Sequence, residues 1–189
     1  MKIILVVTGL PSKKEPARSK FNQIYAKALI DFGHDLEVIY LRTLNPRRKL
    51  INKVSLNGLD IIEFSIMIPF LGVILKNYFS EKLFNYLLTR IQLNADVIHG
   101  SGGGTLIFAN SISKNLDIPY IIQYIGNDLN YDIKLLIKLK AYTEGIQNCA
   151  YHGFESYALE SIFKSYFPQI ANRVVLYRGT NDLGYKFSM

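Results

Sequence analysis

The chain has 189 residues, of which 49% are hydrophobic and 20% charged, and its formal net charge is +7. This composition is typical of one folded globular domain and excludes disordered and fibrous proteins. The single cysteine, Cys149, excludes an internal disulfide. The longest apolar stretch, residues 64–75, is interrupted by polar, proline and glycine residues, and it falls short of the roughly 18–20 residues that span a bilayer. With no secretory signal, we expect a cytoplasmic protein that is not integral to a membrane.

The first predicted element is a buried strand at Ile3–Val7, a continuous run of β-branched and aliphatic residues. Gly9 opens the loop that follows it. In the next segment, apolar residues recur three and one positions apart, which places them on one face of a helix. They are Phe21, Ile24, Tyr25, Ala28, Leu29 and Phe32. Gly33 is predicted to end this helix, and Leu36–Leu41 is the next predicted strand.

The same alternation of short β-rich runs and helical patterns continues through the rest of the chain. Further strands are predicted at residues 61–66, 96–99, 119–124, 150–154 and 173–177. Helices are predicted at residues 71–92, 105–116, 132–147 and 156–166. This order favours an α/β fold, a Rossmann-like doubly wound parallel sheet with helices on both faces.

Positive charge is concentrated in the first third of the chain. Residues 1–60 hold 11 of the 22 Lys and Arg but only 5 of the 15 Asp and Glu. Most of the excess lies in two clusters, at residues 13–20 and 47–53. Such a patch fits nucleic acid, an anionic membrane surface or a phosphorylated ligand, and equally a plain solvated surface. Since no nucleic-acid-binding motif is present, we expect no nucleic acid partner.

Two glycine-containing loops follow predicted strands and are candidates for ligand binding. One contains Gly9, and the other contains Gly102 and Gly103 within residues 100–104. Glycines let backbone amides approach a ligand closely, and ligands of doubly wound folds bind at the carboxyl ends of strands. Neither loop carries a dinucleotide fingerprint or a Walker motif, so each could also be an ordinary tight turn.

Among the histidines, His99 is the best functional candidate, because it ends a predicted strand on the side where ligands bind. The three histidines, His34, His99 and His152, have no metal-ligand spacing and no cysteine pair near them, so we expect no metal site. Asp128 closes another loop after a strand. It is either a ligand-binding carboxylate or the side chain of an Asx-type turn.

The order of these segments resembles the N-terminal domain of family-four, GT-B-type glycosyltransferases. Five segments carry the resemblance, and together they extend over nearly the whole chain. They are Leu5–Pro11, Ala28–Val38, Ala95–His99, Ile118–Asp128 and Arg173–Asn181. Ile125 stands where the family has a histidine that contacts the donor sugar, so the resemblance assigns no such role to this position.

The resemblance implies transfer of a sugar from a nucleoside-diphosphate sugar, with no essential metal or other cofactor. It implies that residues 1–180 are the acceptor-side domain and that residues 181–189 start a linker to a missing donor-binding Rossmann domain. Gly9, with Arg18 or Lys20, is expected to face the donor diphosphate, since amides and cations stabilise its negative charge. His99 and Asp128 are expected to bind hydroxyls of the acceptor or the donor sugar.

Two functions fit this interpretation. The first is a transferase acting on a cell-envelope polysaccharide or glycolipid, whose present chain alone folds but transfers no sugar. The second is a non-catalytic subunit of a split transferase that binds acceptor or recruits the complex to a membrane. Peripheral association with an anionic membrane is suggested by the basic run Arg47–Lys53 and the apolar stretch Phe64–Leu75, which leads into an aromatic helix with Tyr78, Phe79, Phe84 and Tyr86. That stretch could instead be core.

Overall fold

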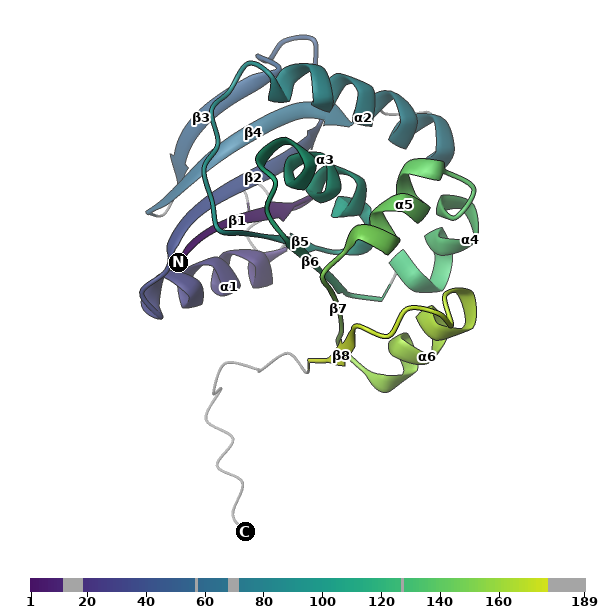
Figure 1. Cartoon of the computed structure of the whole chain (residues 1–189). Helices are drawn as coiled ribbons and strands as arrows, with labels where there is room; N and C mark the ends of the chain where they lie inside the picture. The colour runs from purple at the N-terminus through teal and green to yellow at the C-terminus, as the bar shows by residue number, and fades with distance from the viewer. Residues whose placement is uncertain (12–18, 57, 68–71, 127, 177–189) are drawn as a thin grey trace.

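A single sheet runs through the molecule with the strand order β3-β4-β2-β1-β5-β6-β7-β8 (Figure 1). The structure is a computed structural model that describes residues 1–11, 19–56, 58–67, 72–126 and 128–176. The strands are β1 (Lys2–Val7), β2 (Asp35–Thr43), β3 (Ile51–Leu56), β4 (Leu59–Met67), β5 (Val97–Ser101), β6 (Tyr120–Tyr124), β7 (Tyr151–Phe154) and β8 (Arg173–Val175). Neighbouring strands pair in parallel except at the edge, where β3 is antiparallel to β4.

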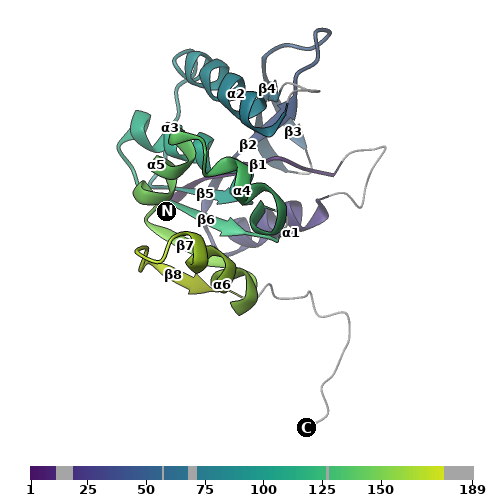
Figure 2. The same ribbon diagram turned by 90° about the vertical axis from the view of Figure 1, so that its right-hand side faces the viewer.

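Helices lie on both faces of this sheet (Figures 1 and 2). They are α1 (Lys20–Asp31), α2 (Val73–Leu88), α3 (Leu106–Leu116), α4 (Ile133–Leu136), α5 (Lys140–Asn148) and α6 (Tyr157–Tyr166), with a 3-10 turn η1 (Gly103–Thr105) and a π-helical turn η2 (Asp128–Asp132). Of the described helices, only α1 packs on the face formed by Leu5, Val38 and Ile61. The others pack on the opposite, larger core. The predicted fold class is therefore confirmed.

The face of α1 that packs on the sheet differs from the predicted one. Asn22 and Ala26 are the buried residues of this helix, whereas Phe32 is 81% exposed and Ile24 is half-buried. The helix is rotated in this way because the Asn22 side chain bonds to groups beneath it, as described below. Gly33 ends the helix as predicted, with a positive φ of 82° that favours glycine.

The single helix predicted over residues 132–147 is wrong. The chain forms η2, α4 and α5 there, and Leu139 before α5 has an extended backbone. Both Leu136 and Tyr142 are buried in the larger core. In one continuous helix these two side chains would point about 120° apart, at ~100° per residue, so the break lets both reach the core.

The edge strand β3 was not predicted. It pairs with β4 in antiparallel fashion, and the sequence between the two strands is Asn57-Gly58, a dipeptide that is a strong hairpin signal. Part of the basic run, Lys53, therefore lies on an edge strand. Within the stretch Phe64–Leu75, Phe64 and Ile66 are buried in β4, which supports the core interpretation for these two residues.

No helix within the described part of the chain is long and apolar enough to cross a membrane. Residues 68–71 and 177–189 lie outside the described residues, so the predicted linker at 181–189 and the end of the last resemblance segment are not described.

Candidate substrate site at the carboxyl edge of the sheet

The strands β1, β5 and β6 are neighbours, and the loops after them meet at one edge. Val7 at the end of β1 is level with Ser101 at the end of β5, which in turn pairs with Gln123 near the end of β6. Because parallel strands end at the same edge, the sequence-predicted residues Gly9, Gly102, Gly103 and Asp128 all follow strands at this carboxyl edge.

The loop after β1 is fixed by a buried side chain of α1. The Asn22 amide donates to the Gly9 carbonyl at 2.8 Å, and its oxygen accepts from the Ser101 hydroxyl at 2.8 Å. A Cβ at Gly9 would lie 2.2 Å from Ser19 Oγ and 2.9 Å from Ser19 Cβ, so glycine lets the start of α1 approach. Lys20 is exposed at the first residue of that helix, and Arg18 lies outside the described residues.

His99 lies in β5 beneath α1 rather than in an open loop. It is 6% exposed, its Nδ1 is 2.8 Å from the Tyr25 hydroxyl, and the two rings meet edge to face. Burial lowers the pKa of His99 to about 4, so the ring is neutral at pH 7. Its Nε2 is buried and has no hydrogen-bond partner among the described residues. His99 thus offers one unpaired polar atom near the edge.

Asp128 bonds to the protein's own backbone. Its carboxylate accepts hydrogen bonds from the backbone N–H groups of Gly103, Ile125, Gly126 and Leu129. Burial raises the pKa of Asp128, and the amides of Gly103, Ile125 and Gly126 act in the opposite direction. Four donors match the lone pairs of one carboxylate, so this geometry supports a structural role for Asp128, which joins its own loop to the glycine loop.

The hydrogen bond to Asp128 also engages the backbone of the glycine loop. With its N–H donated to Asp128, Gly103 no longer has a free amide for a ligand, while Gly102 adopts a φ of 92° and its carbonyl accepts from Thr105 Oγ1 at 2.7 Å. Asp128 and Gly103 therefore join the loops after β5 and β6 through a buried hydrogen bond.

Sequence reasoning did not identify Asn22 and Ser101 as part of this edge. The available signal was Asn22, a polar residue in the first turn of the helix that follows β1. Its partner Ser101 is 79 positions away, however, so only the fold brings the two side chains together.

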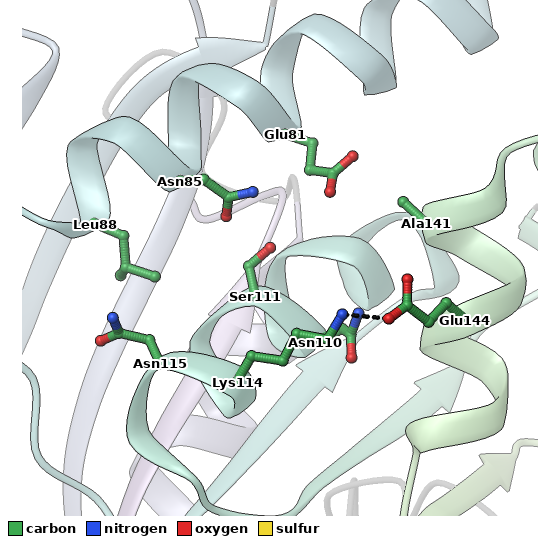
Figure 3. Close-up of a pocket in the computed structure, with 9 residues that line it drawn as sticks. All are labelled: Glu81, Asn85, Leu88, Asn110, Ser111, Lys114, Asn115, Ala141 and Glu144. Carbon is green, nitrogen blue, oxygen red and sulfur yellow. Dashed lines mark hydrogen bonds and ion pairs between the residues drawn. The ribbon is translucent and has the colours of Figure 1, made fainter.

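A hollow lies away from this edge, between α2, α3 and α5 (Figure 3). Its volume is about 340 Å³ and its lining is mostly polar. An ion pair between Lys114 of α3 and Glu144 of α5 crosses one side of it, and this pair lowers the pKa of Glu144. None of the seven residues proposed from the sequence lines this hollow. In the described residues, no group of three or more His, Cys, Asp or Glu side chains could hold a metal ion.

No protein-family model matches the sequence, and no curated protein matches it. Solved structures do share its fold. A sucrose-phosphate synthase from Thermosynechococcus elongatus superposes with a TM-score of 0.65 at 12% identity, covering 95% of this chain and 48% of that one. The lipopolysaccharide outer core galactosyltransferase WaaB gives 0.57 at 14% identity, covering 95% and 46%.

The UDP-GlcNAc 2-epimerase from Methanocaldococcus jannaschii gives a TM-score of 0.52 at 12% identity, covering 93% of this chain and 45% of that one. The chain thus spans about half the length of each of these three proteins. Because one is an epimerase, the shared fold by itself does not determine the reaction. The neighbours are predominantly GT-B glycosyltransferases, so the chain has the glycosyltransferase-like Rossmann fold of a GT-B N-terminal domain.

Proposed function

We propose that the chain is the acceptor-side half of a glycosyltransferase that moves a sugar from a nucleoside-diphosphate sugar to a cell-envelope polysaccharide or glycolipid. The observation that carries the proposal is the carboxyl edge, where Asn22 and Asp128 hold the loops after β1, β5 and β6. Within β5, His99 Nε2 is buried without a hydrogen-bond partner among the described residues. Among the fold neighbours, one galactosyltransferase acts on lipopolysaccharide, and a starch synthase was solved with ADP and acarbose.

The chemistry of sugar transfer explains what this edge would contribute. A departing nucleoside diphosphate gathers negative charge, which amides and cations must stabilise. The N-terminus of α1 begins beside Gly9 and carries the partial positive charge of a helix start, and Lys20 adds a full one. Arg18 would add a second cation in the same segment. Most donor contacts are assigned to a further Rossmann domain, joined after residue 180.

The experiment is an NMR titration of the isotope-labelled chain with UDP-, ADP- and GDP-sugars and with acceptor-type saccharides. We expect amide shifts at Gly9, Lys20 and Gly102, and weaker nucleotide binding in Lys20→Ala. The matched control is Lys27→Ala, which removes another exposed lysine of α1 and should bind as wild type. Shifts confined to other surfaces, or none at millimolar ligand, would overturn the proposal.

A second candidate is the non-catalytic subunit of a split transferase. The observation that favours it is the engagement of Asp128 and Gly103 with each other, which leaves few free side chains for catalysis. Under either function we expect no sugar transfer by this chain alone. Steady turnover of a nucleotide sugar by the purified 189-residue chain would contradict both. If a matching donor-binding Rossmann protein restores transfer, the chain acts as an enzyme half, whereas acceptor or vesicle binding without restored transfer favours the subunit.

A further inference from the structure

The outer face of α2 carries four large apolar side chains that are exposed. Leu75 is 53% exposed, Tyr78 47%, Phe79 46% and Tyr86 53%. The opposite face of the helix packs on the larger core, with Phe84 fully buried against Phe64 and Phe108. Four large apolar side chains stay about half exposed on the outer face, so this face has the composition of a surface that contacts something else.

Two cations lie on the same face. Lys82 Nζ lies 5.7 Å from the Tyr78 ring centre, and the Arg90 guanidinium lies 4.5 Å from that of Tyr86 and donates to its hydroxyl. The surface is called the α2 stripe below and consists of Leu75, Tyr78, Phe79, Lys82, Tyr86 and Arg90. At ~100° per residue the five positions within α2 fall within about 100° of the helix circumference, and Arg90 follows just after the helix. The stripe contains no acidic residue.

We propose that the α2 stripe lies flat on an anionic lipid surface. Tyrosine and phenylalanine rings enter the interface between head groups and acyl chains, and lysine and arginine bind lipid phosphates from the same depth. Charge complementarity favours lipid over a second copy of the chain. Two stripes facing each other would bring the cations of both copies together without an acidic partner in the stripe.

The position of α2 brings this surface close to the edge where the acceptor is proposed to bind. The helix follows β4, a parallel strand, so its first turn with Leu75 lies at the carboxyl edge of the sheet, the edge that carries Gly9 and Asp128. A membrane lying along α2 would therefore border the edge where an acceptor is proposed to bind. The inference goes beyond the proposed sugar transfer and does not depend on it, since lipid binding needs neither donor nor acceptor.

The α2 stripe differs from the membrane-binding surface expected from the sequence. Of the residues named there, Phe64 and Phe84 are fully buried and cannot touch lipid without unfolding. Tyr78, Phe79 and Tyr86 remain, joined by Leu75. The two cations Lys82 and Arg90 come from α2 and the residues just after it rather than from the run Arg47–Lys53.

The test is flotation of the full chain with phosphatidylglycerol-containing vesicles and with pure phosphatidylcholine vesicles. We expect binding to the anionic vesicles that weakens between about 0.05 M and about 0.5 M salt, because salt screens the attraction. Lys82→Glu with Arg90→Glu should weaken binding by about tenfold or more, and so should Tyr78→Ser with Phe79→Ser.

Matched controls separate the stripe from general charge and general apolarity. Lys27→Glu with Lys164→Glu changes the net charge equally on α1 and α6, and Phe32→Ser with Tyr151→Ser removes two exposed aromatics elsewhere. Both controls should float much more strongly than the stripe variants. Circular dichroism confirms that each variant folds. The proposal is overturned by absent wild-type binding, by equal losses in controls and stripe variants, or by a dimer that the stripe variants dissociate while vesicles bind nothing.

Discussion

The carboxyl edge and the α2 stripe differ in how their side chains find partners. At the edge, Asn22, Ser101 and Asp128 are buried and bond within the protein itself. On the α2 stripe, large apolar side chains such as Leu75 and Tyr86 stay half exposed to solvent. The first region is buried and polar, and the second is exposed and largely aromatic. The comparison shows that a motif rich in glycine and aspartate can serve loop geometry, and that the exposed aromatic surface lies on another element.

Among the buried polar groups, the largest expected effect on stability comes from acid acting on two histidines. His99 and His152 are both buried, and burial lowers the pKa of each from 6.5 to about 4. Between these two values the unfolded chain binds more protons than the folded one, so stability falls as the pH drops from about 6.5 to about 4. Each histidine should cost about 3 kcal/mol over this window. Urea unfolding at several pH values measures it.

Single substitutions show how much of this loss of stability each histidine contributes. His99→Gln and His152→Gln should each reduce the dependence of the unfolding free energy on pH by about half. The raised pKa of Asp128 acts in the opposite sense, since its protonation in acid relieves a buried charge, but it is common to wild type and variants and cancels in the difference. A wild-type pH dependence in both variants would mean that neither imidazole is kept neutral by burial.

Next in size is the bond between the two loops. Asp128→Ala removes the carboxylate that accepts from the N–H groups of Gly103, Ile125 and Gly126, whereas the Leu129 N–H keeps the Gly126 carbonyl as an acceptor. We expect a loss of about 3 kcal/mol in the free energy of unfolding. Asp31→Ala, at the exposed end of α1, is the control and should change it by less than about 0.5 kcal/mol. If Asp128→Ala were equally harmless, the carboxylate would be free for a ligand after all.

Asn22→Ala should have a smaller effect, about 2 kcal/mol, because it removes the partner of the Gly9 carbonyl and of the Ser101 hydroxyl. The loop after β1 should also loosen, which amide exchange and the NMR signal of Gly9 would report. Lys27→Ala, one turn further along the exposed side of α1, is the reference. Unchanged exchange around Gly9 would show that Asn22 stabilises the helix without positioning the loop.

The strands and the edge were predictable from the sequence because their signals are local. The run Ile3–Val7 is apolar on both faces, as a central parallel strand must be, and residues that follow parallel strands necessarily gather at one edge. The hairpin of β3 was signalled by Asn57-Gly58, but the basic residues before it suggested a surface rather than a strand.

The partners of the site residues were not predictable in the same way. The bond from Gly103 to Asp128 joins residues 25 positions apart, and that from Ser101 to Asn22 joins residues 79 positions apart. Periodicity likewise could not say which face of α1 is buried, since Phe32 fits the apolar pattern and is nevertheless 81% exposed. Such choices depend on tertiary contacts that a single sequence does not encode locally.

The smallest expected effect on stability belongs to the α2 stripe. Tyr78→Ser with Phe79→Ser should change the free energy of unfolding by only about 1–2 kcal/mol, because both rings are already about half exposed in the folded chain. Phe84→Ala on the same helix should instead cost about 3–5 kcal/mol, since it empties a fully buried position between Phe64 and Phe108. Urea unfolding of the two variants side by side makes the comparison within one element. A loss of more than about 2 kcal/mol in the stripe variant would mean that these two rings stabilise the fold. Lipid binding would then not be needed to explain why aromatic residues occupy this face.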